Sequence, residues 1–383
     1  MSIPTSQKVL RLEKPHDQQK GQRNLAAVRE ALVPDAKDGQ VLVQIHAAGF
    51  NRRDEWAMLG AYPGLTYKDS TLGCDGAGVI VRGDAASKPT HPQGLVLLVP
   101  TRGWASDKAG PEGELPNSTE SKQVNDLGGK GFGLLGATKP TSGAGTFAEY
   151  IQVGKDQVAD APRHLDAVQA ACLPCGGVTA YRALFTKGQL QSGQNLLVTG
   201  IGGGVALLAL QLAVAAGANV YVTGGSDAKI ARAKELGAKG GAIYKDATWP
   251  EQIRKLLAEH SKDRPYLDVV LDSAGGEIPA QAAKSGIRNG GKIVCFGMTA
   301  VPKMTFTMRE VLKNVDILGS TMGSAAEFRD MLKFVEKHKI VPIVDTVLQG
   351  LDEAKKGFPL LADADKRSGG KVVVSLVSNQ SKL

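Results

Sequence analysis

The chain has 383 residues, of which 42% are hydrophobic, and a formal net charge of +8. The length allows two domains of ordinary size, and the four cysteines are too scattered for a disulfide framework. The basic residues are spread along the chain with few aromatic residues between them, and residues 205–220, the most apolar region, contain polar residues and glycine. We therefore expect no nucleic-acid partner and no membrane span.

Residues 8–100 read as short strands separated by glycine and proline, for example "QVLVQIHAAGF" at 40–50 and "GAGVIVRG" at 76–83. This pattern is typical of an antiparallel barrel or sandwich. Residues 103–145 differ, because Gly, Pro, Ser, Thr and Lys dominate and hydrophobic periodicity is lost. We expect this segment to be an irregular insertion, either on the surface or as a lid.

From about residue 196 the sequence alternates strand-like and helix-like segments, which predicts a parallel sheet with helices on both faces. The six predicted strands lie at 195–200, 219–224, 241–245, 267–273, 291–297 and 315–321. Six such strands indicate an α/β fold, the doubly wound Rossmann sheet that binds dinucleotides. An amphipathic helix is expected at 327–340, followed by strands at 342–348 and 369–377.

The turn between the first strand and the first helix is rich in glycine, "LVTGIGGGVALLAL" at 197–210. Gly200 would allow a sharp turn, Gly203 would admit a diphosphate beside Gly204, and the small Ala206 would let the helix pack on the sheet. Amides at the helix start would then bind the phosphates. The spacing alone also fits a tight turn without a ligand, but the alternating strands around it favour a dinucleotide.

The end of the second strand indicates which dinucleotide binds. Gly224 stands where NAD sites usually carry an acidic residue, and Ser226, Lys229 and Arg232 follow. Lys229 and Arg232 share one helical face, which suits a 2′-phosphate, so we expect NADP(H). The alternative is a solvated helix face, with Asp227 serving the ribose of NAD.

The sequence ends in Ser381, Lys382 and Leu383, the tripeptide read by the peroxisomal import receptor. A short polar tail separates it from the last predicted strand. We expect the protein in peroxisomes, the alternative being a chance tripeptide.

Several blocks in the same order carry a resemblance: "AAGFNRRD" at 47, "GAYPG" at 60, "LGCDGAGVIV" at 72, "GTFAEY" at 145 and "LPCGGVTAYRAL" at 173. With them, the chain resembles the medium-chain dehydrogenase/reductase superfamily, in its zinc-independent branch of quinone oxidoreductases and enoyl reductases. The resemblance implies a GroES-like, β-rich catalytic domain from residues 1–165 and 336–383 around a Rossmann domain at 166–335. It also implies a homodimer that pairs through residues 304–320.

Zinc members of the superfamily carry Cys, His, Glu and Cys where this chain has Asn51, Cys74, Asp75 and Cys175. Cys74, Asp75 and Cys175 offer the three ligands that a catalytic zinc needs. Asparagine is a poor zinc ligand, and no histidine occupies the site. We therefore expect no metal, with a zinc-dependent alcohol dehydrogenase as the alternative.

Without a metal, neutral donors must polarise the carbonyl of a substrate, which favours substrates whose negative charge is delocalised. The resemblance thus implies an NADPH-dependent reductase of an activated C=C or C=O in an enone, quinone, enal or enoyl thioester. Tyr62 matches a tyrosine of the quinone and enoyl reductases and is expected to orient the carbonyl or donate a proton, with Asn51 beside it as an amide donor. Tyr62 as a loop residue that caps the barrel is the alternative.

By position in the family, Thr179, Tyr244 and Gly297 are further expected coenzyme contacts. A third interpretation, a protein that binds NADPH and has lost its chemistry, remains open at this point.

Overall fold

The structure, a computed structural model, describes residues 3–16, 21–83, 89–112 and 132–377. The targeting residues predicted at the end of the sequence, Ser381, Lys382 and Leu383, lie outside these ranges.

By its internal contacts the chain divides into two compact units. The first unit comprises Met1–Cys175, Ser324–Arg367 and Lys371–Leu383, and the second comprises Gly176–Gly323 and Ser368–Gly370. Helix α3 (Pro174–Tyr181) contains the first point of division. The second unit is therefore shorter at both ends than the predicted Rossmann domain at 166–335.

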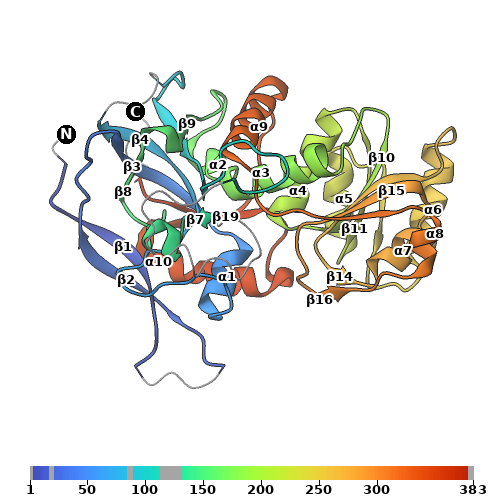
Figure 1. Cartoon of the computed structure of the whole chain (residues 1–383), viewed down its shortest axis with the longest axis horizontal. Helices are drawn as coiled ribbons and strands as arrows, with labels where there is room; N and C mark the ends of the chain where they lie inside the picture. Colours follow the sequence, from blue (N-terminus) through green and yellow to red (C-terminus); the bar gives the residue numbers. More distant parts are fainter. Residues whose placement is uncertain (1–2, 17–20, 84–88, 113–131, 378–383) are drawn as a thin grey trace. The chain divides into compact units, whose positions relative to one another are not determined.

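The second unit is built on a six-stranded sheet, in which Figure 1 labels β10, β11 and β15. The strand order is β12-β11-β10-β13-β15-β17. Every neighbouring pair is parallel. The strands are β10 (Asn195–Ile201), β11 (Asn219–Gly224), β12 (Gly240–Ile243), β13 (Leu267–Asp272), β15 (Ile287–Cys295) and β17 (Asp316–Gly319). Along the chain this order is 3-2-1-4-5-6, which confirms the predicted doubly wound sheet.

Helices cover this sheet because its central strands are apolar on both faces. All six residues of β13 are buried, and the core includes Leu197 of β10 and Tyr221 of β11. The helices are α4 (Gly204–Ala215), α5 (Asp227–Glu235), α6 (Trp249–His260), α7 (Ile278–Lys284) and α8 (Met308–Leu312). Shorter elements are the π-helix Arg182–Lys187 and the paired strands β14 (Gly275–Gly276) and β16 (Val301–Met304).

The first unit is built on a seven-stranded sheet in which β3 pairs with β19, β4 and β8. All of its pairs are antiparallel except that of β18 and β19. Its strands are β3 (Gln40–Gly49), β4 (Asp75–Arg82), β5 (Leu95–Leu98), β8 (Tyr150–Gly154), β9 (Val158–Asp160), β18 (Val344–Gln349) and β19 (Lys371–Ser375). A hairpin of β1 (Ser6–Glu13) and β2 (Leu25–Leu32) accompanies it. The β-rich unit predicted at both chain ends is thus confirmed.

Helices of the first unit are mostly short: α1 (Arg52–Met58), α2 (Ala167–Ala170), α9 (Ala325–His338), α10 (Gly350–Glu353) and α11 (Gly357–Ala362). Single 3₁₀ turns lie at Lys139–Thr141, Lys155–Gln157, Ala354–Lys356 and Ala364–Lys366. Helix α9 begins at a capping box, in which the Glu327 amide donates to Ser324 Oγ at 3.1 Å and the Ser324 amide donates to Glu327 Oε2 at 2.8 Å. None of the helices in the described ranges is long and apolar enough to cross a bilayer.

The predicted irregular insertion at 103–145 needs a correction at its far end. Strand β7 (Gly133–Leu134) pairs with β6 (Thr101–Arg102), and Leu135 and Ala137 are buried. Residues 133–137 are therefore part of the core of the first unit. Their short apolar run lies between polar stretches, so periodicity did not reveal it.

Candidate active site

The glycine turn joins β10 to α4 in the second unit. Gly200 and Gly202 have φ values of +64° and +134°, which other residues rarely adopt. Gly203 differs, because it is the N-cap of α4 with φ −75° and ψ 150°, and a Cβ added to it would meet nothing within 4 Å. The space in front of the helix start is thus open, as a bound diphosphate requires.

The other predicted residues of this turn follow in the first turn of α4. Gly204 is its first residue, and Ala206 is buried against the sheet. One supporting residue escaped the sequence analysis: Asp272, at the end of β13, accepts a hydrogen bond from Thr199 Oγ1 at 2.5 Å. It also accepts from the Gly275 amide at 2.8 Å, so it ties two strand ends together beside the turn.

The residues predicted to distinguish NADP(H) from NAD follow the end of β11, and two of the three lie close to it. Ser226 is the N-cap of α5, and the Lys229 side chain crosses back to the turn, where its Cδ lies 3.2 Å from the Cβ position of Gly202. The Tyr244 hydroxyl lies 2.8 Å from the Cβ position of Gly225, so the Tyr244 ring packs closely against the backbone that follows β11. Arg232 is exposed and forms a 3.6 Å ion pair with Glu235.

Two further predicted contacts lie in the second unit. Gly297 follows β15, and its Cβ position is 3.7 Å from the Ser273 carbonyl oxygen. Ser273 Oγ in turn lies 3.8 Å from the Cβ position of Gly200, so the carboxyl ends of β10, β13 and β15 meet here. Thr179 is buried in α3, and its hydroxyl donates to Met322 Sδ at 3.7 Å.

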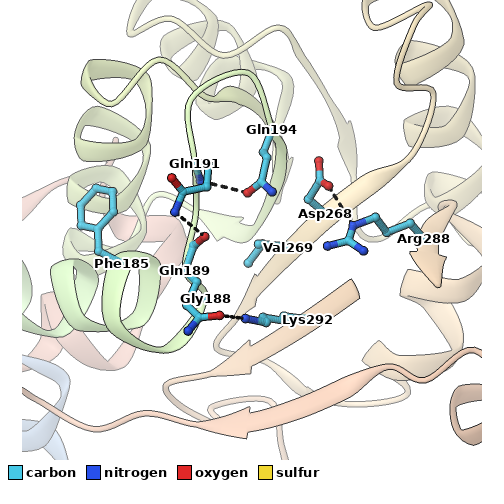
Figure 2. A pocket seen from close by; sticks show the side chains of 9 residues that line it. All are labelled: Phe185, Gly188, Gln189, Gln191, Gln194, Asp268, Val269, Arg288 and Lys292. Carbon is cyan, nitrogen blue, oxygen red and sulfur yellow. Dashed lines mark hydrogen bonds and ion pairs between the residues drawn. The ribbon is translucent and has the colours of Figure 1, made fainter. Parts of the chain in front are cut away.

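A polar pocket of about 420 Å³ lies at the other end of the strands of this sheet, where β10 and β13 begin (Figure 2). Its wall includes Gln194, directly before β10, and Asp268, near the start of β13. The Arg288 Nε donates to Asp268 Oδ1 at 2.9 Å. Because doubly wound sheets bind their coenzyme at the carboxyl ends of the strands, this pocket is not the predicted dinucleotide site.

A buried polar cluster in the first unit holds the other predicted site residues. Lys371 Nζ donates three hydrogen bonds, to the Phe50 carbonyl oxygen at 2.6 Å, to Asn51 Oδ1 at 2.7 Å and to Asp75 Oδ2 at 2.7 Å. The remaining carboxylate oxygen, Asp75 Oδ1, accepts from the Cys175 amide at 2.7 Å. Asn51 Nδ2 is buried and has no partner among the described residues.

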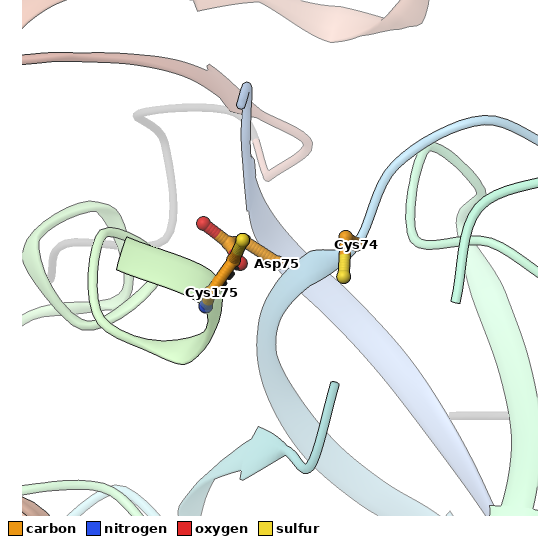
Figure 3. A group of neighbouring side chains, drawn as sticks. All are labelled: Cys74, Asp75 and Cys175. Atoms are coloured by element: carbon orange, nitrogen blue, oxygen red, sulfur yellow. Dashed lines mark hydrogen bonds between the residues drawn. The ribbon is translucent and has the colours of Figure 1, made fainter. Parts of the chain in front are cut away.

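Cys74, Asp75 and Cys175 lie together, as predicted from the zinc members (Figure 3). Their ligand atoms fall within 4.8 Å of one another, and all three residues are buried. The hydrogen bond with Cys74 and burial hold the pKa of the Cys175 thiol well above its usual range. Cys175 therefore favours the neutral thiol here.

Tyr62 follows helix α1 and lies against Arg53, whose Cζ is 4.4 Å from the centroid of the ring. Arg53 is buried, donates to the Gly136 carbonyl oxygen at 2.6 Å and pairs with Asp54 at 3.2 Å. Burial raises the pKa of Tyr62 more than Arg53 lowers it, so the phenol stays protonated.

Lys371 was missed in the sequence analysis. It opens the strand "KVVVS", which reads as the start of an apolar strand after two glycines. A lysine at the start of an apolar strand can equally well point into solvent. It is recognised as a buried cation only once its hydrogen-bond acceptors are known. Those partners are about 300 residues away in the sequence, with separations of 321 for Phe50 and 296 for Asp75.

Both units match known families. Residues 37–163 match the alcohol dehydrogenase GroES-like domain, and residues 204–337 match the zinc-binding dehydrogenase family. A zinc-type alcohol dehydrogenase-like protein of Leptosphaeria maculans is 42% identical over 325 residues, which are 83% of this chain and 85% of that protein. A zinc-type alcohol dehydrogenase-like protein of Schizosaccharomyces pombe is 31% identical over 355 residues, which are 90% of this chain and 93% of that protein.

Among solved structures, an NAD-dependent alcohol dehydrogenase superposes with a TM-score of 0.78 at 27% identity, over 97% of this chain and 100% of that one. A crotonyl-CoA carboxylase/reductase has the same fold, with a TM-score of 0.78 at 21% identity, over 100% of this chain and 90% of that one. With the two family matches and the 42% identical relative, these similarities show that the chain belongs to the medium-chain dehydrogenase/reductase superfamily of oxidoreductases.

Proposed function

We propose that this oxidoreductase uses NADP(H), works without zinc, and reduces an activated C=C or C=O in an enone, quinone, enal or enoyl thioester. One observation carries the proposal: the Asn51 amide has its oxygen bound by Lys371 and its Nδ2 buried without a partner among the described residues. A buried unpaired donor is unfavourable by itself and suits a ligand oxygen.

Zinc independence is supported by the hydrogen bonds that the candidate ligand atoms already accept within the protein. Lys371 occupies Asp75 Oδ2 and Asn51 Oδ1, and the Cys175 amide occupies Asp75 Oδ1. Both carboxylate oxygens of Asp75 thus already accept a hydrogen bond, and the pKa of the Cys175 thiol lies well above its usual range, which disfavours the thiolate that zinc binds. A buried ammonium ion that already neutralises the carboxylate also disfavours a second cation beside it.

The glycine turn and the end of β11 fit the coenzyme. Amides at the start of α4, next to the open space at Gly203, would hold the diphosphate. Ser226, Lys229 and Arg232 would bind the 2′-phosphate, with Tyr244 beside the adenosine. Thr179 and Gly297 would lie toward the nicotinamide.

When bound, the reduced nicotinamide supplies a hydride to the substrate. Asn51 Nδ2 would donate to the carbonyl oxygen, where negative charge develops, and the Tyr62 hydroxyl would supply a proton. A neutral amide stabilises less charge than a metal, so conjugated substrates are favoured because they spread the charge over more atoms.

The proposal is tested on one preparation of the full chain after dialysis against a chelator. We expect oxidation of NADPH in the presence of an enone or quinone, little rate with NADH or a simple ketone, and far less than one zinc per chain. Activity that chelator abolishes and zinc restores would indicate a zinc-dependent alcohol dehydrogenase instead. NADPH binding without turnover on any substrate would indicate a non-catalytic binding protein.

The coenzyme preference gives a separate prediction. Lys229→Ala removes a charge-assisted contact with the 2′-phosphate and is expected to raise the Kd of NADPH by about tenfold or more, with little change for NADH. Lys234→Ala is the matched control, because Lys234 is exposed on the same helix about 140° around its axis. Titration of both coenzymes measures the effect. An equal loss for both would place Lys229 on the diphosphate.

We also propose a homodimer through the edge of the parallel sheet. Within the described ranges β17 pairs on one side only, with β15, and Phe306, Met308 and Leu312 are exposed nearby. Leu312→Glu is expected to give monomers in analytical ultracentrifugation, whereas Leu32→Glu, at an equally exposed leucine of β2, leaves the dimer intact. Unchanged sedimentation of Leu312→Glu would contradict this edge as the interface.

A further inference from the structure

We propose that Lys371 is a positioning residue, which fixes the direction in which Asn51 offers its amide N–H to the substrate. The inference rests on the proposed function and deepens it, because it assigns a role to a residue that does not itself touch the substrate.

The ammonium group has no N–H left for a ligand. A lysine carries three N–H donors, and Lys371 gives one each to Phe50, Asn51 and Asp75 at 2.6–2.7 Å. Its side chain is only 5% exposed. Lys371 therefore acts on a substrate through the groups that it holds.

An asparagine amide has two ends of different chemistry, an acceptor oxygen and a donor NH₂. With Oδ1 bound by Lys371, Nδ2 must point to the other side. Turning the amide over would place its NH₂ against the ammonium group, donor against donor. The Asn51 backbone is also held, since its amide donates to Asp54 Oδ2 at 2.8 Å. Both the backbone and the side chain of Asn51 are thus fixed.

The strand pairing explains why these distant residues meet. Asp75 opens β4 opposite Gly49, the last residue of β3, and Asn51 follows two residues later. On the other side of β3, Val373 of β19 pairs with Gly49, which brings the first residue of β19, Lys371, to the same place. Gly49 leaves room for this arrangement, because a Cβ there would lie 3.1 Å from Asp75 Oδ2.

A double-mutant cycle tests the proposal. The combined change Lys371→Met with Asp75→Asn removes the ammonium and its counter-charge together, so that no unpaired charge is left buried. In the wild-type background it is expected to lower kcat for an enone by about 10²-fold, because the amide is free to turn, with NADPH affinity unchanged. In the Asn51→Ala background the same change is expected to lower kcat by less than about threefold.

Equal factors in the two backgrounds would overturn the inference, since a merely structural Lys371 would act whether or not Asn51 is present. Wild-type protein without turnover on any conjugated substrate would overturn the proposed function, and this inference with it. The two failures are thereby distinguishable.

A second variant carries the test if the combined change does not fold. Asn51→Asp keeps an acceptor for Lys371 but places a second oxygen where Nδ2 was. If Lys371 holds the side chain in place, this oxygen faces the substrate oxygen, and kcat falls at least about tenfold below that of Asn51→Ala in protein that circular dichroism shows to be folded. A kcat at or above that of Asn51→Ala would show that the second polar atom of this side chain does not face the substrate oxygen, and would overturn the inference.

Discussion

Gly203→Val is expected to raise the Kd of NADPH by about 100-fold, or about 2.7 kcal/mol, while the loss of the preferred N-cap glycine lowers the thermal midpoint only slightly. The backbone of Gly203 has φ −75° and ψ 150°, which valine adopts without strain. A Cβ there meets nothing within 4 Å, so the protein itself has room for a branch at this position. The substitution weakens coenzyme binding, because the valine side chain fills the space that the diphosphate needs. Calorimetric titration and a thermal melt measure the two effects separately.

Two other glycines serve as controls. Gly110→Val adds a side chain in similarly open surroundings away from the turn and should change neither quantity. Gly200→Ala should lower the thermal midpoint, because φ is +64° and alanine there is strained by roughly 1 kcal/mol. Wild-type affinity in Gly203→Val would contradict the assignment of this turn to the coenzyme.

The fold of the second unit could be predicted because its signal is local. Each strand is a short apolar run followed by a turn and a helical segment, and β10, β11 and β13 were all found within one residue of their predicted bounds. Parallel strands buried on both faces read as continuous apolar runs, and the glycine turn marks the first crossover. These features depend on neighbours in sequence.

The polar cluster of the first unit could be predicted only in part. Cys74, Asp75 and Cys175 came from the family pattern and do lie together. Lys371 did not, because a buried cation is recognised by its acceptors, and Phe50, Asn51 and Asp75 come from two other strand ends. Pairing between strands about 300 residues apart leaves no periodicity in the sequence. The same is true of Gly136, whose carbonyl oxygen binds Arg53.

Tyr62→Phe is expected to lower kcat by about 10²-fold, with KM and the Kd of NADPH nearly unchanged. The change removes the hydroxyl and keeps the ring that lies over Arg53, so the cation–π contact and the fold are retained. Stopped-flow measurement of the hydride-transfer step under saturating coenzyme isolates this effect. Tyr67→Phe is the matched control, because Tyr67 lies in the same loop as Tyr62 and also loses only a hydroxyl. That hydroxyl accepts a hydrogen bond from Asn24 at 3.2 Å.

The direction of the Tyr62 pKa shift predicts how kcat depends on pH. Burial raises the pKa of Tyr62 from its ordinary value of 10.0, which outweighs the opposing influence of Arg53. A proton donor with a raised pKa stays competent through neutral pH, so wild-type kcat should not fall on the alkaline side until the pH exceeds 10.0. In Tyr62→Phe that alkaline decline should vanish. If kcat of Tyr62→Phe matched the wild type, Tyr62 would be a loop residue that packs on Arg53, and the proton would have to come from water.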